Sequence, residues 1–503
     1  MASDVPLESL SRASLTGLRR GIEKESLRVR ADGTLATTPH AAALGSALTH
    51  PRITTDFSEA QLELITGVHP DADACLRELV EIHQFTYRQI GDELMWGASM
   101  PCRLPAEPDI PIGRYGTSNV GRAKTVYRTG LSYRYGRRMQ TISGIHYNWS
   151  TPDAHDNDAY FALIRNFRRH SWLLLYLFGA SPAVCSTFVA GRPHQLTPLG
   201  GDTLHLPYAT SLRMGRLGYQ SDAQASLKVS YNGLDSYGSS LERALTQSYP
   251  PYEAIGVRDG DEYRQLGTTL LQIENEFYGT IRPKRVIRSG ERPLHALRER
   301  GVEYVEVRLM DLDPFESVGI NADTMRFLDV FLLHCLMRAS PPDTPAELEA
   351  IIANKQRVAS RGREPGLRLV RDGGDATLAE WGREVLDECA PYARALDAAN
   401  ATTRHADALA LAQQRLAEPQ TTPSARVLRE IVERHDSSYV RFVLAQSRAH
   451  REAILALPFG ADANARFERL AARSLEEQRA LEIGDTLSFE DWRQAYLAPV
   501  RLR

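Results

Sequence analysis

The sequence predicts an α+β fold in two parts, a mixed core over residues 1–340 and a mostly helical region over 341–503. Three observations lead to this division. Up to Ala339, short strand-like runs alternate with helical segments. After Pro341-Pro342 the composition shifts to Ala, Arg, Glu and Leu at helical spacing. A chain of 503 residues also exceeds the roughly 250 to 300 residues that one core usually serves. The helical stretches expected in the last third are 379–399, 404–416, 425–449 and 464–483.

The composition is that of an average globular protein, with 43% hydrophobic and 24% charged residues and a net charge of -3. This near-balance argues against binding to nucleic acid or to an anionic membrane, which would need a basic excess. The most apolar stretch, 172–190, contains Gly179 and Pro182, and we expect a buried helix followed by a loop there. A small molecule is therefore the expected substrate.

The five cysteines are scattered, odd in number and form no C-x-x-C pair, so the sequence indicates neither a disulfide framework nor a zinc knuckle. A reducing compartment fits this pattern. The N-terminus lacks the charged and apolar regions of a secretory signal. We therefore expect a cytoplasmic protein.

The first predicted strand, 21–29, carries two carboxylates. Alternation places Glu23 and Glu25 on the same face as Leu27 and Val29. For this motif alone, an inward charge at a sheet edge that discourages aggregation is the simpler explanation.

More carboxylates follow in 55–66. On a helix, Asp56, Glu59 and Glu63 would share one face. On a strand, Glu59 and Glu63 would do so, with Asp56 reaching in from the preceding turn. A solvated helix face is the alternative, but Gln61 to Thr66 is strand-like and half-buried, which makes an unpaired Glu63 costly.

A polar strand face is also predicted in 139–149. There Gln140, Ile142, His146 and Asn148 share one side. A lone histidine on a strand is usually structural. The neighbours on this face are mostly polar, however, and Gly144 allows a ligand or the backbone to approach closely.

Two further segments repeat this design. In 272–278 the even positions put Gln, Glu, Glu and Tyr on one face of an expected strand, ahead of a basic turn at 281–285. In 303–308, Tyr304, Glu306 and Arg308 share a face. Each segment alone is also compatible with a surface ladder of opposite charges. Together, the five segments predict a cup of carboxylates that suits magnesium, with arginines that suit phosphate.

A P-loop is excluded. Residues 116–125 echo one, but Lys124 does not directly follow Gly121 and no apolar strand precedes the segment. Dinucleotide, zinc-protease and serine-hydrolase motifs do not occur in the sequence either. The sequence thus predicts nucleotide-phosphate chemistry without a P-loop.

Six segments together resemble the proteobacterial glutamate-cysteine ligase family in sequence, order and spacing. They are 21–29, 54–66, 140–148, 206–213, 272–278 and 304–308. The resemblance is strong from about residue 18 to 340 and weaker beyond it. It implies a fold like that of glutamine synthetase, with a mainly antiparallel, barrel-like sheet surrounded by helices. The concave face of that sheet would hold metal ions and nucleotide, so residues 1–340 would be the catalytic core.

The resemblance also implies residue roles. The expected metal ligands are Glu23, Glu25, Asp56, Glu63, His146 and Glu306. The expected substrate-binding residues are Tyr127, Leu131, Gln140, Ile142, Arg213, Tyr219 and Tyr278, and the catalytic residues are Arg128 and Arg308. Two or three Mg²⁺ ions are expected, and because magnesium prefers oxygen, a histidine ligand such as His146 predicts some tolerance of Mn²⁺.

The implied reaction uses ATP to phosphorylate the γ-carboxylate of L-glutamate, giving an acyl phosphate that the amine of L-cysteine attacks. This is the first step of glutathione biosynthesis. We expect a monomer that is subject to feedback inhibition by glutathione. The rival functions are a related carboxylate-amine ligase with another amine acceptor, and a non-catalytic ATP or amino-acid sensor on the same fold.

Overall fold

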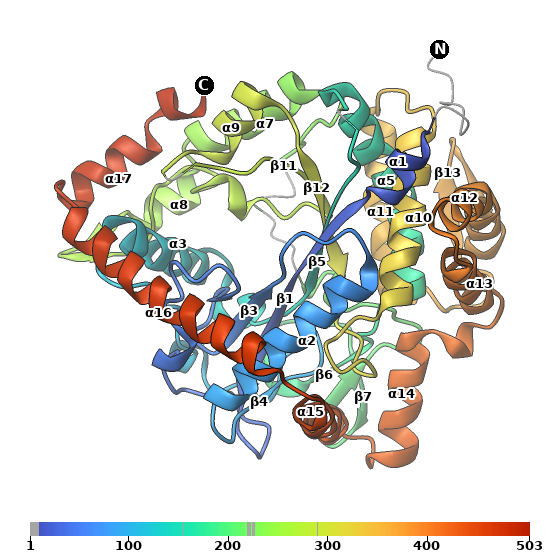
Figure 1. The fold of residues 1–503 in the computed structure, drawn as a ribbon, viewed down its shortest axis with the longest axis horizontal. Coiled ribbons are helices and arrows are strands. Elements are labelled where there is room, and N and C mark those ends of the chain that lie inside the picture. The colour runs from blue at the N-terminus through green and yellow to red at the C-terminus, as the bar shows by residue number, and fades with distance from the viewer. Residues whose placement is uncertain (1–9, 154, 219–222, 224–226, 289) are drawn as a thin grey trace.

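The computed structural model describes residues 10–153, 155–218, 223, 227–288 and 290–503. Its centre is an antiparallel sheet in the order β11-β12-β5-β1-β3-β2, with β4 paired to β1 (Figure 1). The strands are β1 (Arg19–Val29), β2 (Ile53–Thr55), β3 (Gln61–Ile65), β4 (Leu94–Met95), β5 (Ile145–Ser150), β11 (Ile281–Lys284) and β12 (Tyr304–Met310). Helices surround the sheet, which confirms the predicted fold class.

Within the described residues, three small antiparallel sheets lie outside this central one. They are built from β6 (Ala183–Cys185), β7 (Thr197–Gly200) and β8 (Thr203–His205), from β9 (Arg258–Asp259) and β10 (Glu262–Tyr263), and from β13 (Arg368–Arg371) and β14 (Gly374–Thr377). The loop predicted after the apolar helix therefore contains a strand, because Ala183 to Cys185 pair with β8.

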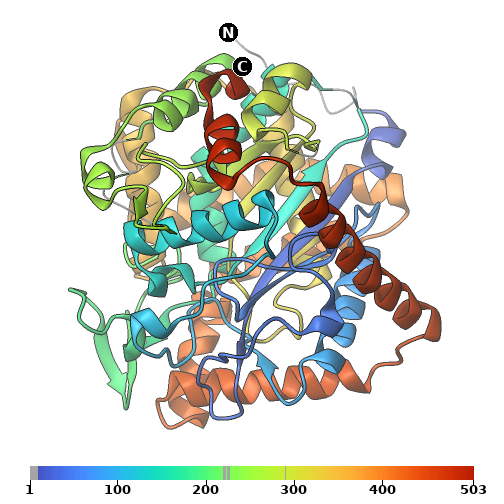
Figure 2. The ribbon, with the colours of Figure 1, turned by 90° about the vertical axis from the view of Figure 1, so that its left-hand side faces the viewer.

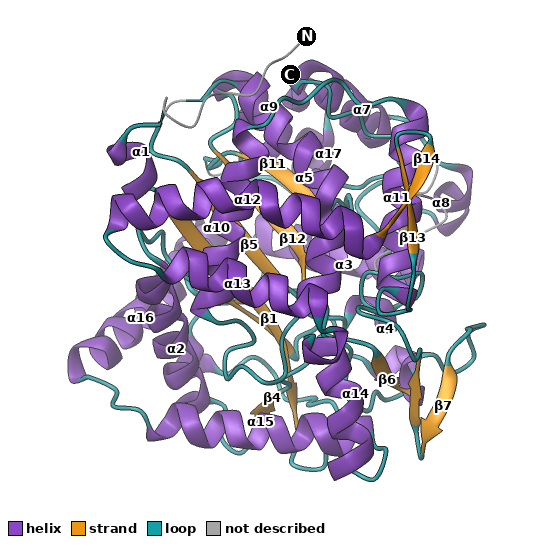
Figure 3. Ribbon diagram, turned by 90° about the vertical axis from the view of Figure 1, so that its right-hand side faces the viewer, coloured by secondary structure: helices purple, strands orange, loops and turns teal. Residues whose placement is uncertain are grey.

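One layer of helices covers one side of the sheet (Figure 3). Side chains of the main hydrophobic cluster, such as Ile22 and Val307, lie on this side. There α5 contacts β12 and β11, α2 contacts β1 and β3, and α10 packs on both helices. The helices on this side are α1 (Arg12–Thr16), α2 (Ala72–Gln89), α5 (Asn157–Phe178), α10 (Ala322–Met337), α11 (Pro345–Arg361), α12 (Leu378–Asn400) and α13 (Arg404–Ala417). The predicted buried helix in 172–190 is confirmed as the end of α5.

Other helices frame the opposite side of the sheet (Figure 1). They are α3 (Asn119–Tyr135), α4 (Arg137–Gln140), α7 (Leu234–Thr246), α8 (Pro250–Ile255), α9 (Pro293–Arg300), α16 (Ala461–Gly484) and α17 (Phe489–Leu497). Figure 2 shows the last two helices crossing this side of the molecule, and α17 contacts α3. The end of the chain thus borders the same space as the first strands.

The helical last third is confirmed, with one correction. The stretch predicted as one helix over 425–449 is two, α14 (Pro423–Arg434) and α15 (Tyr439–Ala456). Asp436 and Ser437 between them adopt positive φ, and Ser438 caps α15 by accepting a hydrogen bond from the Arg441 amide. Aspartate and serine tolerate such turns, so the break needs neither glycine nor proline.

One hydrophobic cluster joins the two parts of the chain. It contains Ile22 and Val307 of the sheet together with Leu386 of α12 and Phe467 of α16.

All five cysteines are buried free thiols. None of the helices in the described part of the chain is long and apolar enough to cross a membrane.

Candidate active site

A cavity of about 790 Å³ opens on the polar side of the central sheet. This volume is within the range of small-molecule sites, about 300 to 1,000 Å³. Its walls come from the sheet, from α3 and from the last two helices. Of the residues predicted from the sequence, it is lined by Glu23, Glu25, Asp56, Glu63, Tyr127, Arg128, Leu131, Gln140, His146, Tyr278, Glu306 and Arg308.

Strand register brings the acidic residues together. Glu23 of β1 lies opposite His146 of β5, and Glu25 lies opposite Glu63 of β3. Asp56 follows directly after β2, so it reaches the same side from a turn, as the strand alternative predicted. Glu59 is in the turn between β2 and β3 and is not part of this group, because its carboxylate accepts the amides of His40 and Arg114.

His146 lies between two of these carboxylates. Its Nδ1 is 3.1 Å from Glu23 Oε2 and its Nε2 is 3.6 Å from Glu25 Oε1. The other oxygen of Glu25 accepts the Gly144 amide at 2.7 Å, and Asn148 donates to Glu23 at 3.0 Å. Burial, followed by the charge of Arg308, lowers the pKa of His146, so the imidazole is neutral and has a lone pair to offer.

The acids do not share one electrostatic environment. Burial and then the charge of Asp56 raise the pKa of Glu25 to about 8. Burial and then the charges of Glu23, Asp56 and Glu25 raise the pKa of Glu63 well above its ordinary value. Both carboxyls are buried beside other acids, an arrangement that a bound divalent cation would stabilise.

Glu306 is in the opposite situation. Lys284 Nζ lies 3.1 Å and Arg308 NH1 lies 2.9 Å from its carboxylate, while Arg282 NH1 is 3.9 Å away. Although burial opposes ionisation, these cations together hold the pKa of Glu306 well below its ordinary value. The cavity therefore has an acidic part on β1 and β3 and a basic part on β11 and β12.

A second group of cations faces the acids from α3. Arg128 donates to the backbone oxygens of Asp56 and Thr55, and its guanidinium lies 4.5 Å from the ring centre of Tyr115. Lys124, one turn earlier, also lines the cavity. Burial and then the charge of Arg128 lower the pKa of Lys124 to about 8.

The predicted substrate-binding residues divide into two groups. Tyr127, Leu131, Gln140 and Tyr278 line the cavity, and Gln140 donates to the Tyr278 hydroxyl at 2.8 Å. Ile142 is buried in a hydrophobic cluster and is not among the described residues that line the cavity. Tyr219 lies outside the described residues.

Arg213 is placed behind the cavity wall. It donates to the Arg308 carbonyl at 2.8 Å and lies 3.8 Å from Asp311. A Cβ on Gly144 would lie only 2.0 Å from its guanidinium. The glycine is thus needed for the approach of an arginine side chain, where we expected a ligand or the backbone.

Two strand predictions are wrong. Residues 272–278 form a short 3-10 helix at Glu274–Glu276, in which Glu274 pairs with Arg292 at 2.8 Å and Glu276 with Arg134 at 2.9 Å. The two ion pairs hold these glutamates to different distant segments, so a common strand face is not required. In 139–149, Gln140 ends α4 and only 145–150 form a strand. His146 and Asn148 share its polar face, but Gln140 and Ile142 do not lie on it.

Sequence reasoning missed several residues of the cavity wall. The sequence patterns place Lys124 only in the excluded P-loop segment and Lys284 only in an expected basic turn, but Lys284 lies at the end of the strand β11. Trp492 and Tyr496 of α17 also line the cavity, and the Arg292 guanidinium, which pairs with Glu274, lies 4.8 Å from the Tyr496 ring centre. Two aromatic residues four apart on a polar helix were the available signal for α17.

Comparisons with known proteins identify the family of the chain. The family model described as glutamate-cysteine ligase matches residues 7–358. The glutamate-cysteine ligase of Janthinobacterium sp. (strain Marseille) is 51% identical over 495 residues, covering 95% of this chain and 94% of that protein. That of Alcanivorax borkumensis is 48% identical over 506 residues, covering 96% of each.

Solved structures are also similar. The glutamate-cysteine ligase of Francisella tularensis, solved in complex with AMP, superposes with a TM-score of 0.91 at 36% identity, covering 96% of this chain and 98% of that one. A bifunctional glutathione synthetase from Pasteurella multocida has a TM-score of 0.73 at 26% identity, with 92% of this chain spanning 57% of that one. The chain belongs to the glutamate-cysteine ligase family.

Proposed function

We propose that this protein joins the γ-carboxylate of L-glutamate to the amine of L-cysteine at the expense of ATP, the first step of glutathione biosynthesis. The observation that carries the proposal is the pairing of acidic residues on the polar face of the sheet with basic residues on the same face and on α3. The carboxylates of Glu25 and Glu63 are suited to bind cations. The positively charged side chains of Arg128, Lys284 and Arg308 are suited to bind anions. A reaction between a nucleotide triphosphate and a carboxylate needs both.

The residues present fit divalent metal ions. Ligand atoms of Glu23, His146 and Glu306 lie within 4.8 Å of one another. Glu25, Asp56 and Glu63 line the same cavity. Burial and neighbouring carboxylates raise the pKa values of Glu25 and Glu63, and a bound cation would relieve this repulsion. We propose that these six residues hold two or three Mg²⁺ ions, with Mn²⁺ as a substitute. Bound there, the ions would neutralise charge on the phosphates.

The chain's own cations would act on the group in transfer. Arg308 is fixed by Glu306 at 2.9 Å, and Arg128 is fixed by backbone oxygens next to Asp56. Both guanidiniums are therefore oriented before substrate arrives, which is the requirement for electrostatic stabilisation of a transferring phosphoryl group. The γ-carboxylate of glutamate would become an acyl phosphate, and the cysteine amine would displace phosphate from it.

The acceptor pocket would be formed by Tyr127, Leu131, Gln140 and Tyr278, and Ile142, Arg213 and Tyr219 remain predicted contributors. Apolar walls distinguish groups of methylene size by only about 1 to 3 kcal/mol. We therefore expect 2-aminobutyrate to replace cysteine. An enzyme that prefers a different amine would belong to the first rival function.

The deciding experiment is ATP-dependent phosphate release with glutamate and cysteine, with each substrate omitted in turn. Release only with all three supports the ligase, and ATP binding without release supports the sensor. Glutamate labelled with isotopic oxygen in its γ-carboxylate should transfer one label to phosphate. Unlabelled phosphate would rule out the acyl phosphate.

Further properties of the chain also stay proposals. We propose that 1–340 is the catalytic core and that 341–503 packs on it, with Leu481, Trp492 and Tyr496 completing the cavity wall. A cytoplasmic monomer inhibited by glutathione is the expected form. Light scattering and glutathione titration of the phosphate assay test the last two properties.

A further inference from the structure

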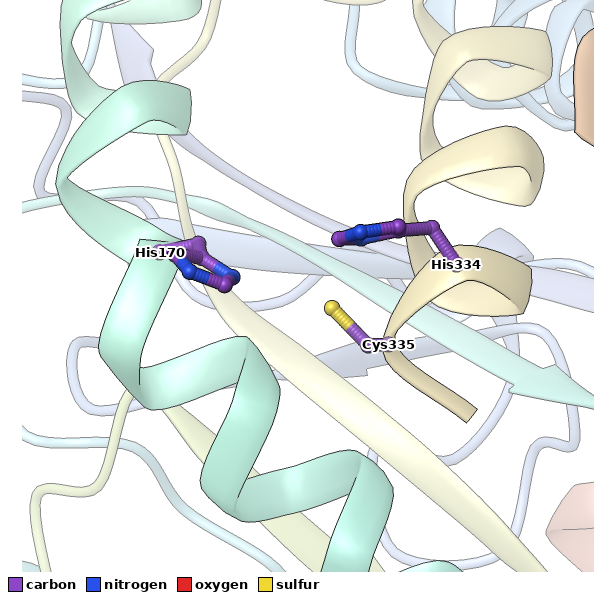
Figure 4. A group of neighbouring side chains, drawn as sticks. All are labelled: His170, His334 and Cys335. Carbon is purple, nitrogen blue, oxygen red and sulfur yellow. The ribbon is translucent and has the colours of Figure 1, made fainter. Parts of the chain in front are cut away.

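A second group of metal-binding side chains lies among the helices that cover the apolar side of the sheet. His170 is on α5, and His334 and Cys335 are neighbours on α10. Their ligand atoms lie within 4.8 Å of one another. Figure 4 shows the sulfur of Cys335 directed toward the space between the two imidazole rings. None of the three lines the cavity described above.

His334 is held in the manner of a metal ligand. Its Nε2 lies 3.0 Å from Glu388 Oε2 on α12, and Glu388 also accepts from Arg338 at 3.4 Å. Its Nδ1 is buried and has no hydrogen-bond partner among the described residues. A histidine that donates one ring nitrogen to a carboxylate presents the lone pair of the other, the usual arrangement around a bound metal.

His170 offers a second lone pair. Its Nδ1 is likewise buried without a hydrogen-bond partner in the described part of the chain. Burial and then the charge of His334 lower its pKa to about 3, so the ring is neutral at physiological pH. The residue as a whole is partly exposed, whereas this Nδ1 is buried.

Cys335 supplies sulfur from a fully buried position. Burial and then the nearby Cys389 raise the pKa of its thiol well above the ordinary value. Two unpartnered ring nitrogens beside a thiol leave buried polar atoms unsatisfied, each at a cost of about 1 to 3 kcal/mol. A purely structural cluster would gain by replacing them with apolar side chains.

We propose that His170, His334 and Cys335 bind one zinc-class transition-metal ion that joins α5 to α10. Nitrogen and sulfur donors select zinc over magnesium, so this site is chemically distinct from the carboxylate cup. Binding forms a metal-thiolate bond and releases the thiol proton to solvent. Water or the Cys389 thiol completes a four-coordinate site, and Glu388 orients His334.

The test uses the full-length protein in saturating Mg²⁺, which keeps the carboxylate cup occupied, and titrates it with Co²⁺ as a coloured probe of zinc sites. One equivalent should produce a thiolate-to-cobalt charge-transfer band and the visible bands of a tetrahedral ion. Zinc should bleach both. Cys335→Ser should remove the charge-transfer band, and Cys102→Ser, at a buried cysteine of another cluster, should retain it.

Two further variants separate binding from folding. His170→Gln, at the partly exposed ligand, should weaken zinc binding by at least a hundredfold. Glu388→Gln keeps all three ligands and should weaken it by about 10- to 100-fold. Zinc should raise the Tm of the wild type and leave that of Cys335→Ser unchanged. Absence of the charge-transfer band in the wild type, or equal zinc affinity in folded Cys335→Ser, would overturn the proposal.

Discussion

The two faces of the central sheet are built from the same strands and have opposite properties. On β12, Glu306 enters the cavity while Val307, the next residue, is buried in the main hydrophobic cluster. On β5, His146 faces the acids while Tyr147 packs beneath the sheet and donates to Asp329 at 2.8 Å. Along these two strands, successive side chains thus point alternately into the cavity and into the hydrophobic cluster.

The two faces of the sheet contribute differently to the stability of the fold. The apolar face removes Ile22, Val305 and Val307 entirely from solvent, and this burial favours folding. The polar face instead gathers carboxyls such as Glu25 and Glu63, whose ionisation is disfavoured there. Burial of the apolar face thus offsets the loss of folding free energy that the buried carboxyls of the polar face cause.

The largest expected effect is on the polar face. Glu63→Gln should lower kcat/KM for ligation by about a hundredfold to a thousandfold, because it removes a charge needed to hold a metal ion. The shape of the side chain is kept, and a repelling charge is lost. Thermal unfolding without divalent ions should therefore show an unchanged or higher Tm.

The matched control is Glu303→Gln, because Glu303 directly precedes β12 and is exposed. It should retain activity within a factor of about two. Near-normal turnover of Glu63→Gln at saturating Mg²⁺ would contradict the metal assignment of that carboxylate.

The next effect concerns Arg308. Lysine lacks the planar fork that lets one guanidinium meet both Glu306 and a phosphoryl group, so Arg308→Lys should lower kcat by about 10- to 100-fold. The KM values for glutamate and ATP should change much less. Steady-state kinetics with each substrate varied will show this. A defect confined to the KM for glutamate would instead make Arg308 a binding residue.

A smaller effect is expected at Val307, which lies between Glu306 and Arg308 on β12. Val307→Ala removes two methyl groups from a site that is 0% exposed and should lower the free energy of unfolding by about 2 kcal/mol. The kcat should stay within a factor of two or so, because Val307 points away from the cavity. Urea unfolding and the phosphate assay measure the two quantities. A large fall in kcat without a fall in stability would break the separation of faces.

Much of this arrangement could be predicted from the sequence, because strands report their two faces by alternation. The polar positions 23, 25, 63, 146, 306 and 308 all lie where period two places them. The helical last third was predicted for a similar reason, since its spacing is local information. The roles assigned by resemblance to Ile142, Arg213 and Tyr219 stay predictions.

The remainder depends on contacts that sequence spacing does not contain. Residues 272–278 alternate like a strand, yet Glu274 and Glu276 are fixed by Arg292 and Arg134 from distant segments. Likewise, α17 reaches the cavity through its packing on α3 and through the Arg292 guanidinium, which donates to the Tyr496 carbonyl. Long-range pairing overrode local pattern at both places.

The smallest expected effect tests the energetic cost of the polar face through pH. Burial raises the pKa of Glu25 from 4.5 to about 8, so between these values the folded chain keeps a proton that the unfolded chain releases. The free energy of unfolding must then fall as pH rises, by at most about 1.4 kcal/mol per pH unit for this group. Because the charge of Glu25 is one of the causes that raise the pKa of Glu63, the wild type should show the joint effect of both carboxyls. With a chelator present, Glu25→Gln should lose the part of this slope that Glu25 contributes and keep the part that Glu63 contributes. Mg²⁺ replaces protons at the carboxylate cup, so Mg²⁺ should stabilise the folded protein more at pH 8 than at about pH 6.

Unfolding curves measured across this pH range, with chelator and with Mg²⁺, compare the wild type with Glu25→Gln. Parallel curves for wild type and Glu25→Gln would mean that the Glu25 carboxyl is already neutralised by the chain itself, and the two faces would then not differ in what they contribute to folding.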